Sequence, residues 1–269
     1  MFIKFSGVSA EGMEFAFSQA GKSNGYFMIK GIYTAASGML PRLLKQDAFA
    51  NNMANANTVG YKKDGVFLHQ LQQAQDGIIT DLDWDIPMVD EIYIDFSNGQ
   101  VRETEQPLDV AIEGTGFFVI QTPAGERYSR NGEFALTPEG QLIDRNGNTV
   151  LSDAGPITIS GDDISISSEG MIAVDGAEAA KIRVVDFDKP YRLRKVDDGY
   201  FAPEDPEVQP KPAENSQLRQ GYVEESNVNI IEEMVDMLIS FRAYEAGQKA
   251  IHAQDETLDK AVNDVGRVR

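Results

Sequence analysis

The chain has 269 residues, of which 42% are hydrophobic and 25% are charged, so it can bury a substantial core as a globular protein. Its formal net charge of −19 makes nucleic acid and anionic lipid unfavourable partners. The absence of cysteine excludes disulfides, thiolate metal sites and cysteine nucleophiles.

The N-terminal segment, residues 1–27, has scattered apolar side chains. They are interrupted by Glu11, Gly12 and Glu14, so the segment lacks the continuous apolar stretch of a signal peptide. We expect a flexible leader that need not be native, because a more regular pattern opens at Met28. No apolar run is long enough to span a bilayer.

Residues 28–60 are predicted to form the first helical segment. From Gly31 to about Ala56, apolar positions recur alternately four and three residues apart, which is a heptad stripe. Pro41 would interrupt such a helix unless it lies in a first turn, so we expect a kink or a late start with Ser37 as the cap. The stripe consists of Ile32, Ala36, Met39, Leu43, Gln46, Ala50 and Met53.

The end of this helix is rich in uncharged amides, in the run ANNMANANTVGYKKDG. Asn51, Asn52 and Asn55 share one face by their spacing, and we predict that they form a packing contact without bringing charge into an interface. Asn57 is equally well explained as part of the fraying end. Gly60 is expected to supply the left-handed turn that ends the segment.

The middle of the chain changes to a period of two. Residues 61–85 are expected to be a connecting segment, with Leu68–Gly77 either helical or loose. Residues 86–201 alternate or are β-branched, which predicts an irregular, mainly antiparallel β domain. The pairs Asn98-Gly99, Asn131-Gly132 and Asn146-Gly147 predict tight hairpins. Residues 202–226, with four prolines in Ala202–Ser216, are expected to be a linker or crossover.

Residues 227–269 are predicted to form the second helical segment. Asn229 is the expected N-cap with Glu232 as its reciprocal partner, and Glu233 suits the positive end of the helix dipole. A heptad stripe follows, and a second apolar stripe lies beside it. The first contains Met234, Met237, Phe241, Tyr244, Ile251 and Leu258, and the second contains Ile231, Val235 and Leu238.

These patterns predict an α+β fold in which the two terminal heptad helices pair as a coiled-coil-like, antiparallel unit, with the β domain between them. One partner helix cannot bury both stripes of the second helix. The remaining stripe therefore indicates contact with another copy of the chain.

No constellation of residues indicates an enzyme or a cofactor site. His69 and His252 lack ligands at metal-binding spacing, and the glycines of Glu113–Phe118 lack the third glycine of a dinucleotide fingerprint, which favours a bulge or close packing. Asp144, Asn146 and Asn148 resemble the start of a calcium loop, but the required glycine and glutamate are misplaced, so a hairpin turn is favoured. Asp162 and Asp163 are expected to lie in a loop.

Three blocks of sequence resemble the bacterial flagellar rod and hook axial proteins. They are YTAASGM…ANNMANANTVGYKKD near the start, PLDVAIEGTGFFVIQTPAGERYSRNGEFALTPEGQLIDRNGNTVL in the middle and SNVNIIEEMVDMLISFRAYEAGQKAIHAQDETLDKA near the end. They cover most of the chain in the order found in the family. The run Arg242–Glu245 is most similar to the distal rod protein.

The resemblance implies a structural subunit of the periplasmic basal-body rod. Such subunits are exported unfolded by the flagellar type III apparatus without a cleaved signal and assemble through their terminal helices into a hollow shaft. The shaft transmits torque and provides the export channel. The implied partners are copies of the chain, adjacent rod and hook subunits and the export apparatus, with no nucleic acid or small-molecule substrate.

The resemblance also assigns residues. The family motifs match at Gly60, Tyr61, Gly114, Gly116, Phe117, Phe118, Glu232, Glu233 and Arg242. The predicted self-assembly interface consists of Asn51, Asn52, Met53, Asn55 and the two apolar stripes of the second helix. The alternatives are a proximal-rod or hook-type subunit and, from a different class, a secreted β-domain binding module with an exposed aromatic groove.

Overall fold

The computed structural model describes residues 39, 41–72, 85–161, 163–196, 199–205, 207–214 and 216–265. Our expectations for the leader 1–27, for Ser37 and for Asp162 lie outside these residues. The chain forms two compact units. Unit 1 takes its described residues from Met1–Ala50, Val66–Tyr93 and Met234–Arg269, and unit 2 from Asn51–Gly65 and Ile94–Glu233.

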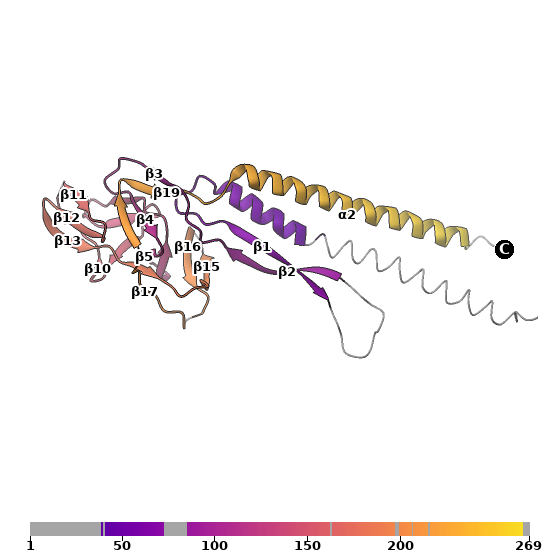
Figure 1. Ribbon diagram of the computed structural model, residues 1–269, viewed down its shortest axis with the longest axis horizontal. Helices are drawn as coiled ribbons and strands as arrows, with labels where there is room; N and C mark the ends of the chain where they lie inside the picture. The colour runs from indigo at the N-terminus through magenta and orange to yellow at the C-terminus, as the bar shows by residue number, and fades with distance from the viewer. Residues whose placement is uncertain are drawn as a thin grey trace, which may run out of the picture. The chain divides into compact units, whose positions relative to one another are not determined.

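Unit 2 contains most of the strands (Figure 1). A ten-stranded sheet runs in the order β15-β16-β6-β5-β9-β8-β7, with β10 paired to β9, β14 paired to β5 and β17 paired to β14. Every pairing with a defined register is antiparallel, which confirms the mainly antiparallel β prediction. The strands are β5 (Phe117–Thr122), β6 (Gly125–Ser129), β7 (Phe134–Leu136), β8 (Leu142–Asp144), β9 (Thr149–Ser152), β10 (Gly155–Pro156), β14 (Val184–Asp186), β15 (Leu193–Val196), β16 (Tyr200–Pro203) and β17 (Lys211–Pro212).

Three smaller sheets complete unit 2. One has three strands in the order β11-β12-β13, and two are pairs, β18 with β4 and β19 with β3. Their bounds are β3 (Val101–Glu103), β4 (Val110–Gly114), β11 (Ile164–Ile166), β12 (Met171–Val174), β13 (Ala177–Lys181), β18 (Ser216–Gln220) and β19 (Tyr222–Glu224).

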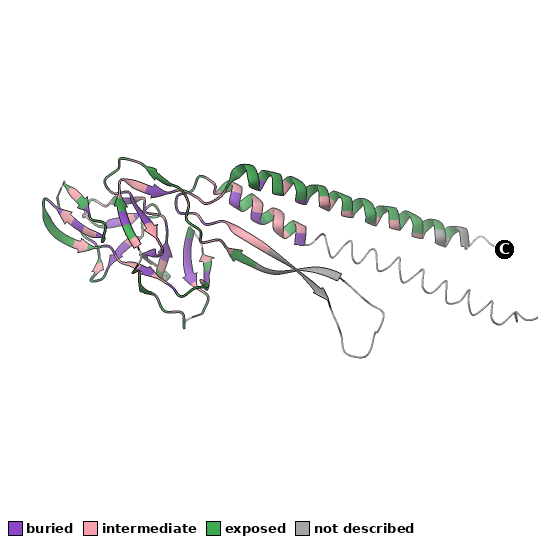
Figure 2. Cartoon of the chain, viewed as in Figure 1, coloured by how far each residue is buried: buried purple, intermediate pink, exposed green. Residues whose placement is uncertain are grey.

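The core of unit 2 lies on both faces of β5. Because successive side chains of a strand point to opposite faces, Phe117 and Val119 join one hydrophobic cluster while Phe118 and Ile120 join another. All four are fully buried. Figure 2 shows that many strand residues of unit 2 are buried, whereas most residues of α2 are exposed.

One of the three predicted Asn-Gly hairpins is confirmed. Gly147 has φ 82° between β8 and β9, where it allows the tight turn. The predictions for Asn98-Gly99 and Asn131-Gly132 are wrong, because neither pair joins two strands that pair with each other. Their glycines serve close approach instead: a Cβ on Gly99 would lie 1.9 Å from the Glu225 carbonyl oxygen, and one on Gly132 would lie 1.8 Å from the Val110 carbonyl oxygen.

The strands extend beyond the expected β segment on both sides. Residues to Gln72, which we expected to be helical or loose, form β1 (Asp64–Gln72), and this strand pairs with β2 (Asp85–Ile94). In the segment 202–226, which we expected to be a linker, β18 and β19 pair with β4 and β3, and Leu218 and Val223 are buried. Prolines punctuate the segment, but its last part alternates like a strand and belongs to the sheets.

Helices flank the strands in the sequence. Residues 41–54 are helical, with Pro41 at the start of that described stretch, and α2 (Ile230–Val265) is a single helix of 36 residues (Figure 1). Asn229 caps α2 as predicted, since its Oδ1 accepts from the Ile231 N–H at 3.1 Å and the Glu232 N–H at 3.4 Å. Glu232 therefore contributes its backbone N–H to the cap. The fold is α+β.

Candidate self-assembly site

The first part of α2 has a covered side and an exposed side. The covered or half-covered positions recur along the helix at Glu233, Met237, Ser240, Tyr244, Gly247, Ile251, Gln254 and Leu258. Of the stripe we predicted, Met237, Tyr244, Ile251 and Leu258 lie on this side. The other predicted positions are displaced by one residue from the covered set, and their side chains are exposed.

The exposed side carries a large apolar patch. We define the α2 patch as Ile231, Met234, Val235, Leu238, Ile239 and Phe241, whose exposed fractions run from 49% to 75%. At 100° per residue, Leu238 points about 160° away from Ser240, so the patch and the covered stripe lie on nearly opposite sides of one helix. After Phe241 the same side is occupied by Arg242, Glu245 and Lys249. The patch is thus limited to the first turns of α2.

The covered side of α2 contacts the part of the first helical stretch that belongs to unit 1, residues 41–50, and the preceding Met39. The Arg42 guanidinium donates to the Ala243 carbonyl at 2.7 Å, and the Ser240 hydroxyl donates to the Arg42 carbonyl at 3.3 Å. A Cβ on Gly247 would lie 3.3 Å from Met39 Cγ. Because lower numbers on one segment meet higher numbers on the other, the two run antiparallel. Small residues at the contact let the two backbones approach.

The amides at the end of the first helix do not act as one stripe. Asn52 is fully buried in unit 2, whereas Asn51 is exposed and Asn55 donates locally to the Asn51 carbonyl at 2.9 Å. Met53 is half-buried. The spacing argument placed three amides on one face but could not show that one of them lies inside the folded chain.

Asn52 uses its full hydrogen-bonding capacity. Its Nδ2 donates to the Asp64 carbonyl at 2.9 Å and to Glu233 Oε2 at 3.1 Å, and its Oδ1 accepts from the Asp64 N–H at 2.8 Å and the Tyr61 hydroxyl at 3.2 Å. The segment after the first helix is thereby fixed to the start of α2. Burial, with the nearby Asp64 and Glu233 carboxylates, raises the pKa of Tyr61.

Tyr61 also meets the β strands. Lys195 Nζ lies 4.0 Å from the centroid of the Tyr61 ring and 2.8 Å from Asp64 Oδ1. Burial lowers the pKa of Lys195 against the opposing effect of Asp64. The motif residue Tyr61 is therefore a contact between the segment 51–65 and β15.

Gly60 is required by its surroundings. Its φ is 71°, and a Cβ at this position would lie 2.4 Å from the Asn131 backbone nitrogen. Its N–H donates to the Glu224 carbonyl at 2.7 Å. In the β motif, Gly116 has φ 122° and faces Val184 and Ala213, which confirms the close packing expected there, and the Gly114 carbonyl accepts from Arg130 Nη2 at 2.7 Å.

A buried charged cluster in unit 2 was not predicted. Lys62 Nζ lies 2.6 Å from Glu224 Oε1, and Arg130 Nη1 lies 3.3 Å from Glu224 Oε2, with side-chain exposures of 1%, 3% and 1% for Lys62, Arg130 and Glu224. Burial lowers the pKa of both Lys62 and Arg130, and Glu224 opposes that effect. The three residues are 68 and 94 positions apart in turn, and no local motif links them.

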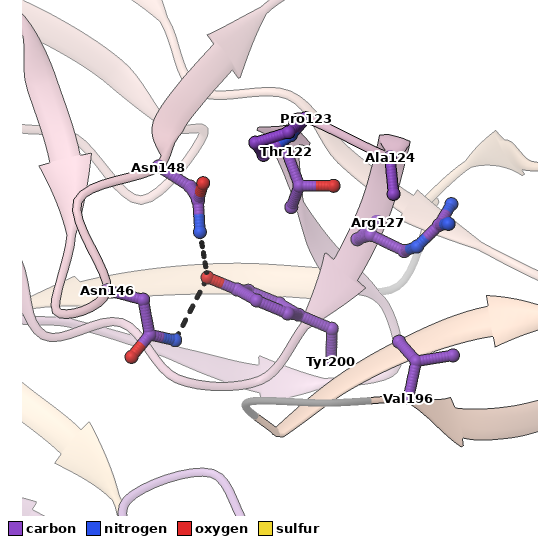
Figure 3. Close-up of a pocket in the computed structure, with 8 residues that line it drawn as sticks. All are labelled: Thr122, Pro123, Ala124, Arg127, Asn146, Asn148, Val196 and Tyr200. Atoms are coloured by element: carbon purple, nitrogen blue, oxygen red, sulfur yellow. Dashed lines mark hydrogen bonds between the residues drawn. The ribbon is translucent and has the colours of Figure 1, made fainter.

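A shallow pocket of about 450 Å³ lies over β6 and β16 (Figure 3). Its floor is Tyr200, whose hydroxyl donates to Asp144 Oδ2 and accepts from the amides of Asn146 at 3.0 Å and Asn148 at 2.7 Å. Burial, with the hydrogen bond to Asp144, raises the pKa of Tyr200 to about 12. Asp144 Oδ1 accepts from the backbone N–H groups of Asn146 and Asn148, so these residues stabilise the turn, as expected.

This pocket does not favour a binding module. The one aromatic side chain in it, Tyr200, is only 4% exposed and offers almost no ring face to a ligand. No group of three potential metal-binding side chains occurs in the described part of the chain. His252 is exposed on α2, and the side chain of His69 lies outside the described residues. None of the described helices is long and apolar enough to cross a membrane.

Helical segments on either side of a β region, with an apolar patch left exposed on α2, define a protein with a large contact surface for other proteins. Three family models match in chain order. They are "Flagella basal body rod protein" at residues 32–62, "Flagellar hook protein FlgE/F/G D1 domain" at 111–174 and "Flagellar basal body rod FlgEFG protein C-terminal" at 219–264.

Curated relatives match over most of their length. The flagellar basal-body rod protein FlgG of Borreliella burgdorferi is 32% identical over 261 residues, covering 88% of this chain and 98% of the relative. FlgF of Caulobacter vibrioides is 30% identical over 246 residues, covering 90% and 100%. The hook-basal body complex protein FlhO of Bacillus subtilis is 29% identical over 273 residues, covering 90% and 100%. The chain belongs to the flagellar basal-body rod protein family.

Proposed function

We propose that this chain is a structural subunit of the periplasmic flagellar rod and that it assembles with copies of itself and with adjacent rod or hook subunits through its terminal helices. Family membership supports the structural role and assembly with other axial subunits. The α2 patch is the observation that carries the proposed contact, because no described part of the chain covers these apolar side chains.

The antiparallel contact between residues 41–50 and α2 within unit 1 supports the first half of this proposal, a paired inner unit. The α2 patch, on the other side of the helix, supports the second half, a contact between subunits. Repeating one contact between different surfaces yields an open helical array and not a closed oligomer. A hollow shaft that transmits torque and provides the export channel is the assembly we propose.

A groove in unit 2 offers a second candidate contact surface. It has a volume of about 580 Å³ and is lined by Ser97–Gln100 and Glu225–Ile231, together with Ala56. Ile231 lines this groove and is 75% exposed. The groove thus combines exposed apolar and polar lining residues, a composition suited to a contact between subunits.

The first experiment determines the cellular location of the chain. An epitope tag inserted at the exposed Asp175-Gly176 turn, where Gly176 has open space around it, reports whether the chain copurifies with basal bodies. We expect copurification with the rod and hook, and loss of assembly and motility when Val228–Arg269 is deleted. Soluble protein outside the basal body, with normal flagella in the deletion strain, would overturn the proposal.

Within the rod, we assign the chain to the distal segment, on the run Arg242–Glu245. Relatives named FlgG and FlgF both match it, so the family alone does not separate the rod segments. The order of assembly is the test. If the chain is a distal-rod subunit, the proximal rod should still form in a strain that lacks it. Loss of the proximal rod would instead indicate a proximal-rod subunit, and loss of the hook alone a hook-type subunit. We further propose export in an unfolded state without a cleaved signal, and no enzymatic activity.

A further inference from the structure

The buried cluster in unit 2 has two cations and one carboxylate. Lys62 Nζ and Arg130 Nη1 both pair with Glu224, and Glu224 Oε1 also accepts from the Gly99 N–H at 2.8 Å. The other hydrogen-bond acceptors of both cations are neutral groups. Lys62 donates to the Ser97 carbonyl at 2.7 Å. Arg130 donates to the carbonyls of Ile112 at 3.2 Å and Gly114 at 2.7 Å, and to Asn98 Oδ1 at 3.5 Å.

Glu224 is the only carboxylate in ion-pair contact with either cation among the residues that the structure describes. Burying a charge without its counter-ion is far more costly than burying a matched pair. Without this carboxylate, the native packing of unit 2 would enclose two cations with no carboxylate in ion-pair contact, and only the more distant Asp95 and Asp186 would act on Lys62 and Arg130 respectively. The Coulombic effect of Glu224, which opposes the lowering of both pKa values by burial, agrees with this geometry.

The three charged residues of the cluster come from distant parts of the chain, and Glu224 comes last. Lys62 lies before all strands of the ten-stranded sheet and Arg130 follows β6. Glu224 is the last residue of β19, the last strand in the described part of the chain. In the folded chain β18 pairs with β4, and β19 pairs with β3 with Glu224 opposite Val101, so these pairings hold Glu224 at the cluster. Of the buried residues in the two apolar clusters that pack on β5, all except Leu218 precede β18 in the chain.

We propose that Glu224 is the counter-ion on which closure of unit 2 depends, so that its sheets stay open until β18 and β19 bring this carboxylate to Lys62 and Arg130. Until β18 and β19 have paired with β4 and β3, unit 2 then stays unfolded, although most of its core residues are already present. Such a delay suits a subunit that must not fold before all of it is available. The inference rests on the cluster and not on the proposed location of the protein.

The test compares two neighbouring glutamates in the full chain. E224Q keeps the size of the side chain but removes the charge from the buried cluster. E225Q is the matched control, because Glu225 forms an exposed pair with Arg102 at 2.7 Å. We expect E224Q to shift the folding equilibrium by about 10²- to 10³-fold toward the unfolded state and E225Q to change it less than about threefold.

Hydrogen exchange shows whether the loss concerns all of unit 2. In E224Q we expect the protection of the Leu142 and Val150 amides, in β8 and β9, to fall together with that of β3 and β19. Loss of protection confined to β3 and β19 would overturn the proposal, since the carboxylate would then hold only its own strand. Equal behaviour of E224Q and E225Q would overturn it as well.

A second set of variants covers the case in which E224Q does not fold. E224D retains the charge on a shorter side chain, and the triple variant K62M/E224M/R130M removes all three charges. We expect both to fold more stably than E224Q, because neither leaves the two cations without a carboxylate. If both unfold as readily as E224Q, the shape and hydrogen bonds of Glu224 explain its role, and the proposal fails.

Discussion

Asn52 and Glu233 lie 181 residues apart in the chain and are joined by a buried hydrogen bond of 3.1 Å between Nδ2 and Oε2. Asn52 is the last buried residue of the first helical stretch, and Glu233 is in the first turn of α2. The bond needs a neutral amide, because only an amide can donate to the Glu233 carboxylate and the Asp64 carbonyl while it accepts from Tyr61 and Asp64.

Replacement of the Asn52 amide by a carboxylate is the most direct test of the contact between Asn52 and Glu233. N52D has nearly the same shape but loses both donors and places a second negative charge against buried Glu233. We expect it to lower the free energy of unfolding by about 3–5 kcal/mol in urea titration. N51D, at an exposed neighbouring position, is the control and should change it by less than about 0.5 kcal/mol. Similar effects of the two variants would contradict the assigned role of Asn52.

Gly60 and Gly147 have similar backbone angles but different surroundings, so alanine variants of the two distinguish the cost of a steric overlap from the cost of the left-handed backbone alone. Gly60 and Gly147 have φ values of 71° and 82°, but a Cβ on Gly147 would meet nothing within 4 Å, whereas one on Gly60 would overlap the backbone of Arg130 and Asn131. G147A should therefore cost only the left-handed backbone, about 1 kcal/mol in unfolding free energy. G60A should cost several times as much. Thermal unfolding of both variants would show equal losses if the Gly60 contact were unimportant.

The strand region was predictable because its signals are local. Alternating apolar residues and the turn at Asn146-Gly147 identify strands and a hairpin within a few residues of sequence. The glycines of Asn98-Gly99 and Asn131-Gly132 could not be interpreted in this way, because they face Glu225 and Val110, which pattern analysis cannot place beside them. The same limit applies to Lys62, Arg130 and Glu224, since a buried charge looks like a surface charge in sequence.

The helix stripe shows a different limit. We expected the heptad stripe of α2 to face the first helix, but only part of it does: Met237 and Tyr244 lie on the covered side with Ser240 and Gly247. Met234 and Phe241 of the same predicted stripe are exposed. Close approach of two helices favours small residues, so the contact within the chain is the less apolar one. Hydrophobic periodicity identifies a surface to be buried but not the molecule that buries it. The assignment of the interface residues as a whole remains a prediction.

The Tyr200 network predicts a dependence of stability on alkaline pH. The pKa of Tyr200 rises from 10.0 to about 12 in the folded chain, so the folded state keeps a proton that the unfolded state loses. Its contribution is present in full below pH 10 and is lost as the pH rises from 10 to about 12. Y200F should be less stable than the wild type at pH 7, by about 1–3 kcal/mol, because Asp144 and two amides lose a partner.

The difference between Y200F and the wild type should then narrow between pH 10 and 12. Urea unfolding at several pH values measures it, and subtraction removes the contribution of Tyr191, whose pKa is also raised to about 12. Y244F is the control, because that hydroxyl accepts only a 3.4 Å bond from Gln248 on an exposed helix. A constant difference across this pH range would show that the Tyr200 hydroxyl does not hold its proton in the folded chain.

The α2 patch predicts a variant that folds normally but does not assemble. Leu238 is 50% exposed and makes part of the patch, so L238K should leave the unfolding free energy of the isolated chain within about 0.5 kcal/mol of the wild type. In an assembly the lysine would be buried against apolar side chains without a partner, which is costly. We expect loss of incorporation into basal bodies and loss of motility. A246K is the matched control, because Ala246 is also exposed but lies beyond the patch, next to Glu245 and Lys249 on α2. Normal motility with L238K, or an equal loss with A246K, would place the contact between subunits on another surface.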